Sequence, residues 1–456
     1  MQKRLKCFLR TFSAIEGPKQ LIQHELLEKI FRSFLSHQDL NIAGYSLSFL
    51  MKFKFDYLVP YHRHLKEMMQ KGKLRSSLLN LSEMIEEGQM NNKHRKLMLP
   101  ILARILFGRV TAKSGKSSND SPTARRAAVL SFMSVICKEE EDFFPFLYLM
   151  TRCFIPKTEK LDLVELYEPD DQSRILDTLT RTSSDDMALL PSPVIEGFLH
   201  LLQSVLSQFG HHVISWIPQL TAITVELCKF VKVENGTVVT KSLSTKTDGE
   251  ERKGSIDSIR RSSIRTLCFQ RLSDIFSLFG SSLDFTNIAE RLWPAIQPSL
   301  TLLPEMVIRN DGCPAILTLL QTISADANLI TLLYSCYEAV HAVVKCISVT
   351  SRISVIQASL TFVENLLSVT GEDSELIGKN LVCKYAPLLL EQFTMRLEGK
   401  EVTDAIAAVG KSRSKISLKN SPTWRRELQI LFRICELFSF DVGLNCSRDF
   451  YVLWTT

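Results

Sequence analysis

The tetrapeptide SGKS at residues 114–117 contains the Gly-Lys-Ser with which a phosphate-binding P-loop ends. It lies in a basic stretch, FGRVTAKSGKSSNDSPTARRAA, which runs from residue 107 to residue 128. In a P-loop, backbone N–H groups wrap the phosphates of a nucleotide and the lysine neutralises their charge. The stretch could therefore hold a nucleotide, or its cations could bind phosphate in another setting.

The spacing around SGKS argues against a nucleotide site. Gly108 precedes Gly115 by seven positions, two more than the motif G-x-x-x-x-G-K-[ST] allows. A P-loop also follows a buried strand, whereas the segment before this one, KLMLPILARILFGRV, repeats its apolar residues with a helical period. We therefore predict that Lys116 takes no part in nucleotide chemistry.

Other reactive side chains lack the spacing that catalysis requires. The pairs His62-x-His64 and His211-His212 belong to no H-E-x-x-H or zinc-type Cys/His set, and no G-x-S-x-G nucleophile motif occurs. The acidic run at 139–142 could be read as paired catalytic carboxylates, but it is more typical of a helix cap and first turn, where negative charge is favourable. We expect no enzyme, no cofactor, no metal and no small-molecule substrate.

The composition favours long helices and reduced thiols. Of 456 residues, 45% are hydrophobic, whereas glycine (18) and proline (16), which interrupt helices, are scarce. The 11 cysteines lie singly, without a C-x-x-C pair, as expected for buried thiols in a reducing compartment. No run of about 18 apolar residues occurs, and Arg10 interrupts the first apolar stretch, so we expect neither a membrane span nor a secretory signal.

Apolar residues recur with a helical period along most of the chain. In PSPVIEGFLHLLQSVLSQFG they fall on one helix face, at Val194, Phe198, Leu201, Leu202, Val205, Leu206 and Phe209. A second apolar helix follows Gly210, and similar pairs recur at 38–53 with 56–69, 91–110 with 124–136, 255–279 with 284–306, 314–326 with 327–345, and 353–369 with 379–398. Because one pair cannot bury its own apolar face, we predict an all-α fold, an irregular HEAT-like α-solenoid of antiparallel helix pairs with long polar loops.

The expected solenoid covers residues 1–456 as a single domain. It is interrupted by polar loop insertions at 111–123, 155–190, 233–257 and 399–420. The second insertion is acidic, whereas the other three carry lysines and arginines at or near their ends. Since the net charge is only +6, this clustering of cations points to an anionic partner more than the total charge does.

Two of the basic ends share one pattern. SPTARRAAVLSF (121–132) and SPTWRRELQILF (421–432) both read S-P-T-x-R-R before an apolar helix, with serine suited to the N-cap and proline to the first helical position. Free N–H groups and two guanidinium groups can bind an anion there, although ordinary capping preference with solvated arginines is the alternative. The anion interpretation expects Arg125 and Arg126 to be exposed. It predicts contacts to RNA or DNA phosphates from Arg109, Lys113, Lys116, Arg125, Arg126, Arg425 and Arg426.

The segment LPILARILFGRVTAKSGKS, followed by a Ser-rich basic loop and ARRAAVLSFM, resembles the giant HEAT-repeat scaffold of the small-subunit processome, the down-regulated-in-metastasis protein family. LLPSPVIEGFLHLLQSVLSQFGHHVISWIPQL and CFQRLSDIFSLFGSSLDFTNIAERLWPAI look like successive stretches of the same region, so the resemblance covers about 91–310. It implies a nucleolar, non-enzymatic scaffold for maturation of small-subunit rRNA, with pre-ribosomal RNA and processome proteins as partners and no membrane. Members of the family are several times longer, so the chain is expected to be an internal segment.

Two other classes of function stay open. A transport-receptor-like or other solenoid adaptor would bind a peptide or a small GTPase on its concave face, without salt-sensitive affinity for RNA. An NTPase would require nucleotide binding, which the spacing of Gly108 and Gly115 argues against.

Overall fold

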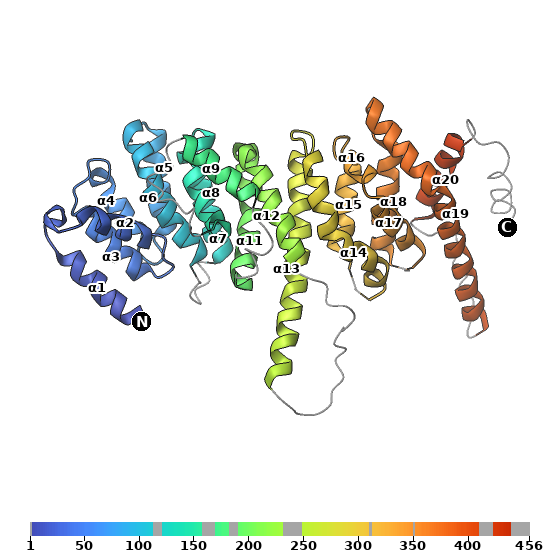
Figure 1. Cartoon of the computed structure of the whole chain (residues 1–456), viewed down its shortest axis with the longest axis horizontal. Coiled ribbons are helices and arrows are strands. Elements are labelled where there is room, and N and C mark those ends of the chain that lie inside the picture. The colour runs from blue at the N-terminus through green and yellow to red at the C-terminus, as the bar shows by residue number, and fades with distance from the viewer. Residues whose placement is uncertain are drawn as a thin grey trace. The chain divides into compact units, whose positions relative to one another are not determined.

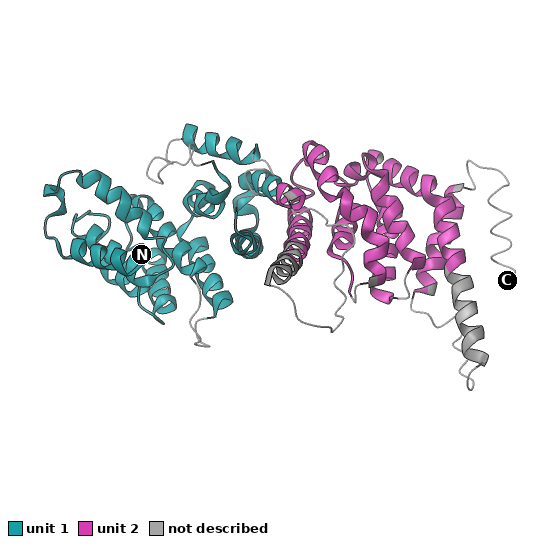
Figure 2. Cartoon of the chain, turned by 60° about the horizontal axis from the view of Figure 1, so that its bottom comes forward, with its two compact units in different colours: residues 1–223 teal, residues 224–456 magenta. Residues whose placement is uncertain are grey.

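The computed structural model describes residues 2–112, 121–156, 169–181, 190–230, 249–309, 312–349, 352–409 and 423–438. Within these residues every regular element is a helix and no strand occurs (Figure 1). The helices pack in the pattern of an α-solenoid, so the predicted all-α, HEAT-like fold is confirmed. The chain forms two compact units, residues 1–223 and residues 224–456 (Figure 2).

The first unit stacks its helices in successive pairs. Helices α1 and α2 both pack on α3, and α4 packs on α5. Helices α5, α7 and α11 then pack side by side in one row, while α6 packs on both α7 and α8. The bounds are α1 Gln2–Ala14, α2 His24–Phe34, α3 Leu40–Met51, α4 His62–Met68, α5 Leu74–Glu86, α6 Asn92–Thr111, α7 Pro122–Ile136, α8 Phe144–Thr151, α9 Pro169–Thr180 and α11 Ser192–Phe209. Helix α12 (Ile217–Phe230) spans the boundary with the second unit.

Helix α6 is buried on nearly every face. Its buried residues run without a gap from Met98 to Leu106 and again from Gly108 to Val110. A helix that is apolar on most of its faces belongs in a core, and this stretch is the segment that the sequence predicted to be a helix in place of a P-loop strand. The basic stretch around SGKS therefore follows the central helix of the first unit.

The second unit has two parallel rows of helices. Helices α13, α15, α18 and α20 pack in succession in one row, and α14, α17 and α19 do so in the other. Each helix thus contacts the next member of its own row, which is how a solenoid buries apolar faces that a single pair would expose. The bounds are α13 Gly249–Phe279, α14 Ala289–Arg309, α15 Ala315–Ala325, α16 Ile330–Tyr334, α17 Tyr337–Val349, α18 Ile353–Ser368, α19 Glu372–Val409 and α20 Trp424–Phe438.

The polar insertions contain more helix than expected. Helix α9 lies inside the insertion predicted at 155–190. Its packing is explained by Ile175 and Leu179, which lie one helical turn apart and are both buried. Helix α13 begins at residue 249 and α19 continues to residue 409, so parts of two further insertions are helical.

The helix expected at 327–345 is two helices, α16 and α17. The indole N–H of Trp293 donates to the carbonyl oxygen of Leu332 (3.1 Å) and to the hydroxyl of Ser335 (2.9 Å). Trp293 thus fixes the short connection between the two helices, and the break depends on a residue some forty positions earlier in the chain.

Candidate nucleic-acid interface

Helices α6 and α7 begin with side-chain caps. The Asn91 side chain accepts a hydrogen bond from the N–H of Lys93 (2.9 Å), and the Ser121 hydroxyl accepts one from the N–H of Ala124 (3.2 Å). Pro122 is the first residue of α7. The predicted roles of Ser121 and Pro122 at this helix start are therefore confirmed, and they follow from local chemistry alone.

The first guanidinium group of the S-P-T-x-R-R motif is engaged within the fold. Arg125 Nη2 donates to the carbonyl oxygen of Ala112 (2.6 Å), the C-cap residue of α6. Arg95 makes the matching contact at the other end of the pair, where its Nη1 donates to the carbonyl oxygen of Ile136 (2.8 Å), the last residue of α7. The last carbonyl groups of a helix lack donors within that helix. Each arginine therefore supplies a donor to the C-terminus of the helix that runs antiparallel to its own.

The expectation that Arg125 and Arg126 are both exposed is wrong. Arg125 is only 4% exposed, since its guanidinium group turns toward the end of α6. Arg126 is half-buried, and burial lowers the pKa of its guanidinium group, as does the charge of Arg125. Of the two, only Arg126 presents an appreciable part of its side chain to solvent.

Arg109 is also buried, with 3% exposure in the last turn of α6. The neighbouring Gly108 lies directly against the backbone between α2 and α3, where a Cβ would stand 3.0 Å from the carbonyl carbon and oxygen of Ser36. Only glycine permits this close approach without movement of the backbone. The Gly-Arg segment therefore serves the packing of α6, and Lys113 and Lys116, which follow it in the chain, lie outside the described residues.

The second S-P-T-x-R-R motif orients its arginines differently. Arg425 is exposed, whereas Arg426 forms an ion pair with Glu364 and donates a hydrogen bond to the Thr361 hydroxyl (2.6 Å), both on α18. The hydrogen bond that Arg426 donates to Glu364 raises the pKa of Arg426 despite partial burial. Helix α20 begins at Trp424, and the N–H of Glu427 donates to the carbonyl oxygen of Thr423, so the helix starts two residues later than the N-cap predicted for Ser421 requires. At α7 the first arginine of the motif, Arg125, is therefore buried, whereas at α20 the second arginine, Arg426, is paired with Glu364.

Three exposed cations that the sequence analysis did not single out lie at the start of α5, the helix that packs beside α7. They are Lys71 and Lys73, before α5, and Arg75, the second residue of α5. Arg75 Nη2 lies 3.4 Å from the carbonyl oxygen of Ala124, so the first turns of α5 and α7 are neighbours. The available signal was local composition, because the fifteen residues from 68 to 82 contain three cations and no acid.

The acidic run at 139–142 serves the fold. Glu139 and Asp142 form a capping box around the short 3-10 helix Glu140–Phe143, as the capping interpretation predicted. Asp142 is only 7% exposed and pairs with Arg95, while also accepting hydrogen bonds from the N–H groups of Lys138 (3.0 Å) and Glu139 (3.2 Å). Across the described residues, no group of three or more His, Cys, Asp or Glu side chains is arranged to hold a metal ion.

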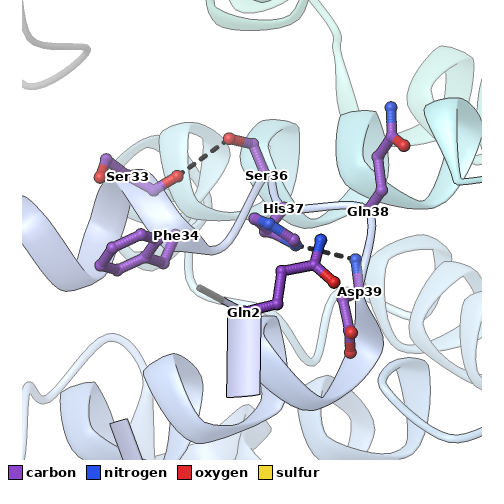
Figure 3. A pocket seen from close by; sticks show the side chains of 7 residues that line it. All are labelled: Gln2, Ser33, Phe34, Ser36, His37, Gln38 and Asp39. Carbon is purple, nitrogen blue, oxygen red and sulfur yellow. Dashed lines mark hydrogen bonds between the residues drawn. The ribbon is translucent and has the colours of Figure 1, made fainter. Parts of the chain in front are cut away.

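A polar depression of about 570 Å³ lies where α1 meets the turn from α2 to α3 (Figure 3). Its two titratable side chains have structural partners. The His37 Nδ1 accepts the N–H of Asp39 (2.9 Å), and the Asp39 carboxylate pairs with Lys6 (2.5 Å) and accepts the N–H of Asn41. Both side chains thus stabilise the start of α3 and its contact with α1. The lining consists of Gln2, Ser33, Phe34, Ser36, His37, Gln38 and Asp39.

Five cysteines among the described residues are buried, at positions 137, 228, 268, 336 and 346, and none forms a disulfide. Burial raises the pKa of Cys336 to about 11 and that of Cys346 to about 12. These five thiols are buried, as expected, whereas Cys7 and Cys313 are exposed. Among the helices in the described part of the chain, none is both long and apolar enough to cross a membrane.

Comparison with known proteins identifies the family of the chain. Residues 1–441 match the family model described as U3 small nucleolar RNA-associated protein 20, N-terminal. A curated relative, the U3 small nucleolar RNA-associated protein 20 of Schizosaccharomyces pombe, is 23% identical over 124 residues. That match covers 27% of this chain and 5% of the yeast protein, so the chain is matched to a small part of its relative. The chain belongs to the family of the N-terminal region of U3 small nucleolar RNA-associated protein 20.

Proposed function

We propose that the chain is a non-catalytic scaffold in assembly of the small ribosomal subunit. In this role it supports pre-rRNA processing in the nucleolus by binding RNA phosphates and assembly-factor proteins of the small-subunit processome. The family match over residues 1–441 carries the proposal, because the relatives are named for association with a small nucleolar RNA. Stacked helix pairs support it further, since they offer long surfaces to several partners at once.

The match also supports the resemblance to a processome scaffold that the sequence suggested. The finer assignment, to the down-regulated-in-metastasis protein and to an internal segment of it, stays a prediction. So does the nucleolar location, which follows from the proposed role.

We propose RNA-phosphate contacts for four of the seven candidate cations: Lys113, Lys116, Arg126 and Arg425. Arg126 and Arg425 reach the surface at the starts of α7 and α20, and the two lysines lie in the chain between α6 and α7. The other three are better explained by the fold. Arg109 and Arg125 are buried around the end of α6, and Arg426 is paired with Glu364.

Crosslinking of the tagged chain to RNA in cells, followed by sequencing of the bound RNA, tests this function. We expect small-subunit pre-rRNA to be enriched, and the tagged chain to sediment with pre-ribosomal particles. Sedimentation with a transport complex or another protein assembly, without pre-rRNA, would instead favour the adaptor function. In parallel, Lys116→Ala should leave ATP and GTP binding as undetectable as in the parent chain. Micromolar nucleotide binding that this substitution abolishes would contradict the scaffold function.

A further inference from the structure

Four cations gather where α5 and α7 begin. Lys71, Lys73 and Arg75 are exposed in the turn before α5 and in its first turn, and Arg126 is the fifth residue of α7. The 3.4 Å approach of Arg75 Nη2 to the carbonyl oxygen of Ala124 brings the two segments together, although they are about fifty residues apart in the chain. We call these four residues the α5–α7 basic surface.

The surface has no acidic counterpart in its own segments. Neither residues 68–82 nor residues 121–138 contain an aspartate or a glutamate. Glu67, the nearest acid before the surface, is paired with Arg63 (3.2 Å). Within the described parts of the chain, no carboxylate forms an ion pair with any of the four cations.

The position of these cations is unfavourable for the isolated chain. Lys73 is the N-cap residue of α5 and Arg75 lies in its first turn, where the helix dipole places positive charge. Arg126 is half-buried beside Arg125, and its buried Nε meets no hydrogen-bond acceptor among the described residues. Arg125 and Arg126 therefore repel each other, and the positive end of the α5 dipole repels Lys73 and Arg75. An anion bound at the surface would offset both repulsions.

We propose that the α5–α7 basic surface binds the phosphate backbone of RNA. A polyanion with regularly repeated charges suits cations that are spread over a turn and two helix ends, and arginine binds phosphate through paired N–H groups. The proposal rests on the RNA-binding part of the proposed function and adds Lys71, Lys73 and Arg75 to it. These three residues are exposed and can bind RNA together with Arg126, whereas Arg125 and Arg109 are buried.

The test compares two triple variants of the full chain. Lys71→Ala/Lys73→Ala/Arg75→Ala removes three charges from the surface. The matched control, Lys19→Ala/Lys93→Ala/Lys138→Ala, removes three exposed lysines elsewhere in the first unit. Binding of a fluorescein-labelled single-stranded RNA of mixed sequence is titrated at several salt concentrations. Circular dichroism melting curves establish that each variant is folded.

We expect the surface variant to bind RNA more weakly and the slope of log affinity against log salt to fall by about two units. Each phosphate contact on single-stranded nucleic acid contributes about 0.7 to that slope. The control variant should keep the slope of the parent chain. The charge-preserving variant Lys71→Arg/Lys73→Arg should bind as the parent does, because phosphate attraction depends on charge at these positions.

Three results would overturn the inference. One is equal slopes for the surface variant and the control, which would leave RNA binding to other parts of the chain and the scaffold function intact. Another is a polyglutamate peptide that binds through this surface while RNA does not, which would identify an acidic protein partner. The third is a parent chain with no RNA affinity at low salt. Sedimentation with pre-ribosomal particles would then still decide the scaffold function separately.

Discussion

Arg95 and Arg125 occupy equivalent positions in an antiparallel helix pair, as the fourth residues of α6 and α7, and each donates to a carbonyl group at the C-terminal end of the other helix. Both arginines are buried, and both follow an N-cap side chain, Asn91 or Ser121, by four residues. At each end of the pair, an arginine of one helix thus caps the C-terminus of the other. This role in the fold explains the first arginine of the S-P-T-x-R-R motif at α7 without an external anion.

Replacing Arg125 by methionine should destabilise the first unit. The substitution leaves the carbonyl oxygen of Ala112 without the donor that Arg125 supplies. For a poorly solvated group, this should lower the free energy of unfolding by about 1 to 3 kcal/mol. Arg126→Met is the matched control. It should change stability by no more than about 0.5 kcal/mol, because Arg126 is half-buried and repelled by Arg125. The midpoints of urea unfolding, followed by circular dichroism, compare the two variants, and equal shifts would contradict the structural role of Arg125.

At the other end of the pair, Arg95→Met should be more damaging. It leaves the buried carboxylate of Asp142 without its guanidinium partner, and breaking a buried ion pair in this way costs about 3 to 5 kcal/mol. The double variant Arg95→Met/Asp142→Asn should recover part of the loss, since the uncompensated charge is gone. Thermal unfolding of both variants gives the comparison, and a double variant less stable than the single one would refute this account.

Gly378 should tolerate no side chain. A Cβ at this position of α19 would collide with the carbonyl oxygen of Leu366 in α18, so Gly378→Ala forces the two helices apart. We expect a loss of about 1 to 3 kcal/mol, typical of overpacking. Gly197 in α11 has open space around it, and Gly197→Ala should raise stability by up to about 1 kcal/mol through helix propensity. Loss of stability in both variants would show that crowding at Gly378 is not the cause.

The ion pair of Asp39 with Lys6 should make the first helices sensitive to acid. The hydrogen bond from Lys6 lowers the pKa of Asp39 below 3.8, its ordinary value. Because the folded state holds the carboxylate ionised, this stabilisation is present above that ordinary value and is lost as the pH falls through the folded pKa. In Asp39→Asn the side chain can still cap α3, so the substitution removes mainly the charge. The stability difference between parent and variant, measured from pH 7 down to acid, should shrink toward zero, and a constant difference would contradict the ion-pair explanation.

Thiol alkylation should separate the exposed from the buried cysteines. Cys7 is exposed, whereas burial raises the pKa of Cys336 to about 11 and that of Cys346 to about 12, which suppresses the reactive thiolate. Brief treatment of the native chain with iodoacetamide at pH 8 should therefore modify Cys7 and leave Cys336 and Cys346 unmodified. Peptide mass spectrometry reads out the sites, and denaturation in urea before labelling should make all three reactive. Rapid labelling of Cys346 in the native chain would show that α17 is not packed as described.

The sequence by itself determined the helices that depend on local chemistry. Apolar residues at helical spacing predicted α6, α7 and α11, and the Ser-Pro start of α7 was recognisable because capping involves only neighbouring residues. Short helices within polar stretches were missed. Helix α9 buries two side chains among many charged ones, and the break between α16 and α17 is held by Trp293 from a distant part of the chain.

Only the tertiary structure decided which cations are available to a partner. Arg125 and Arg126 are chemically identical neighbours, but successive side chains point about 100° apart around a helix, and the position of α6 selects the one that is buried. In the same way, Arg75 approaches the carbonyl oxygen of Ala124 because α5 packs beside α7, and no spacing in the sequence reveals that contact. Charge and cap are properties of local sequence, whereas the surface they form depends on how the helices pack.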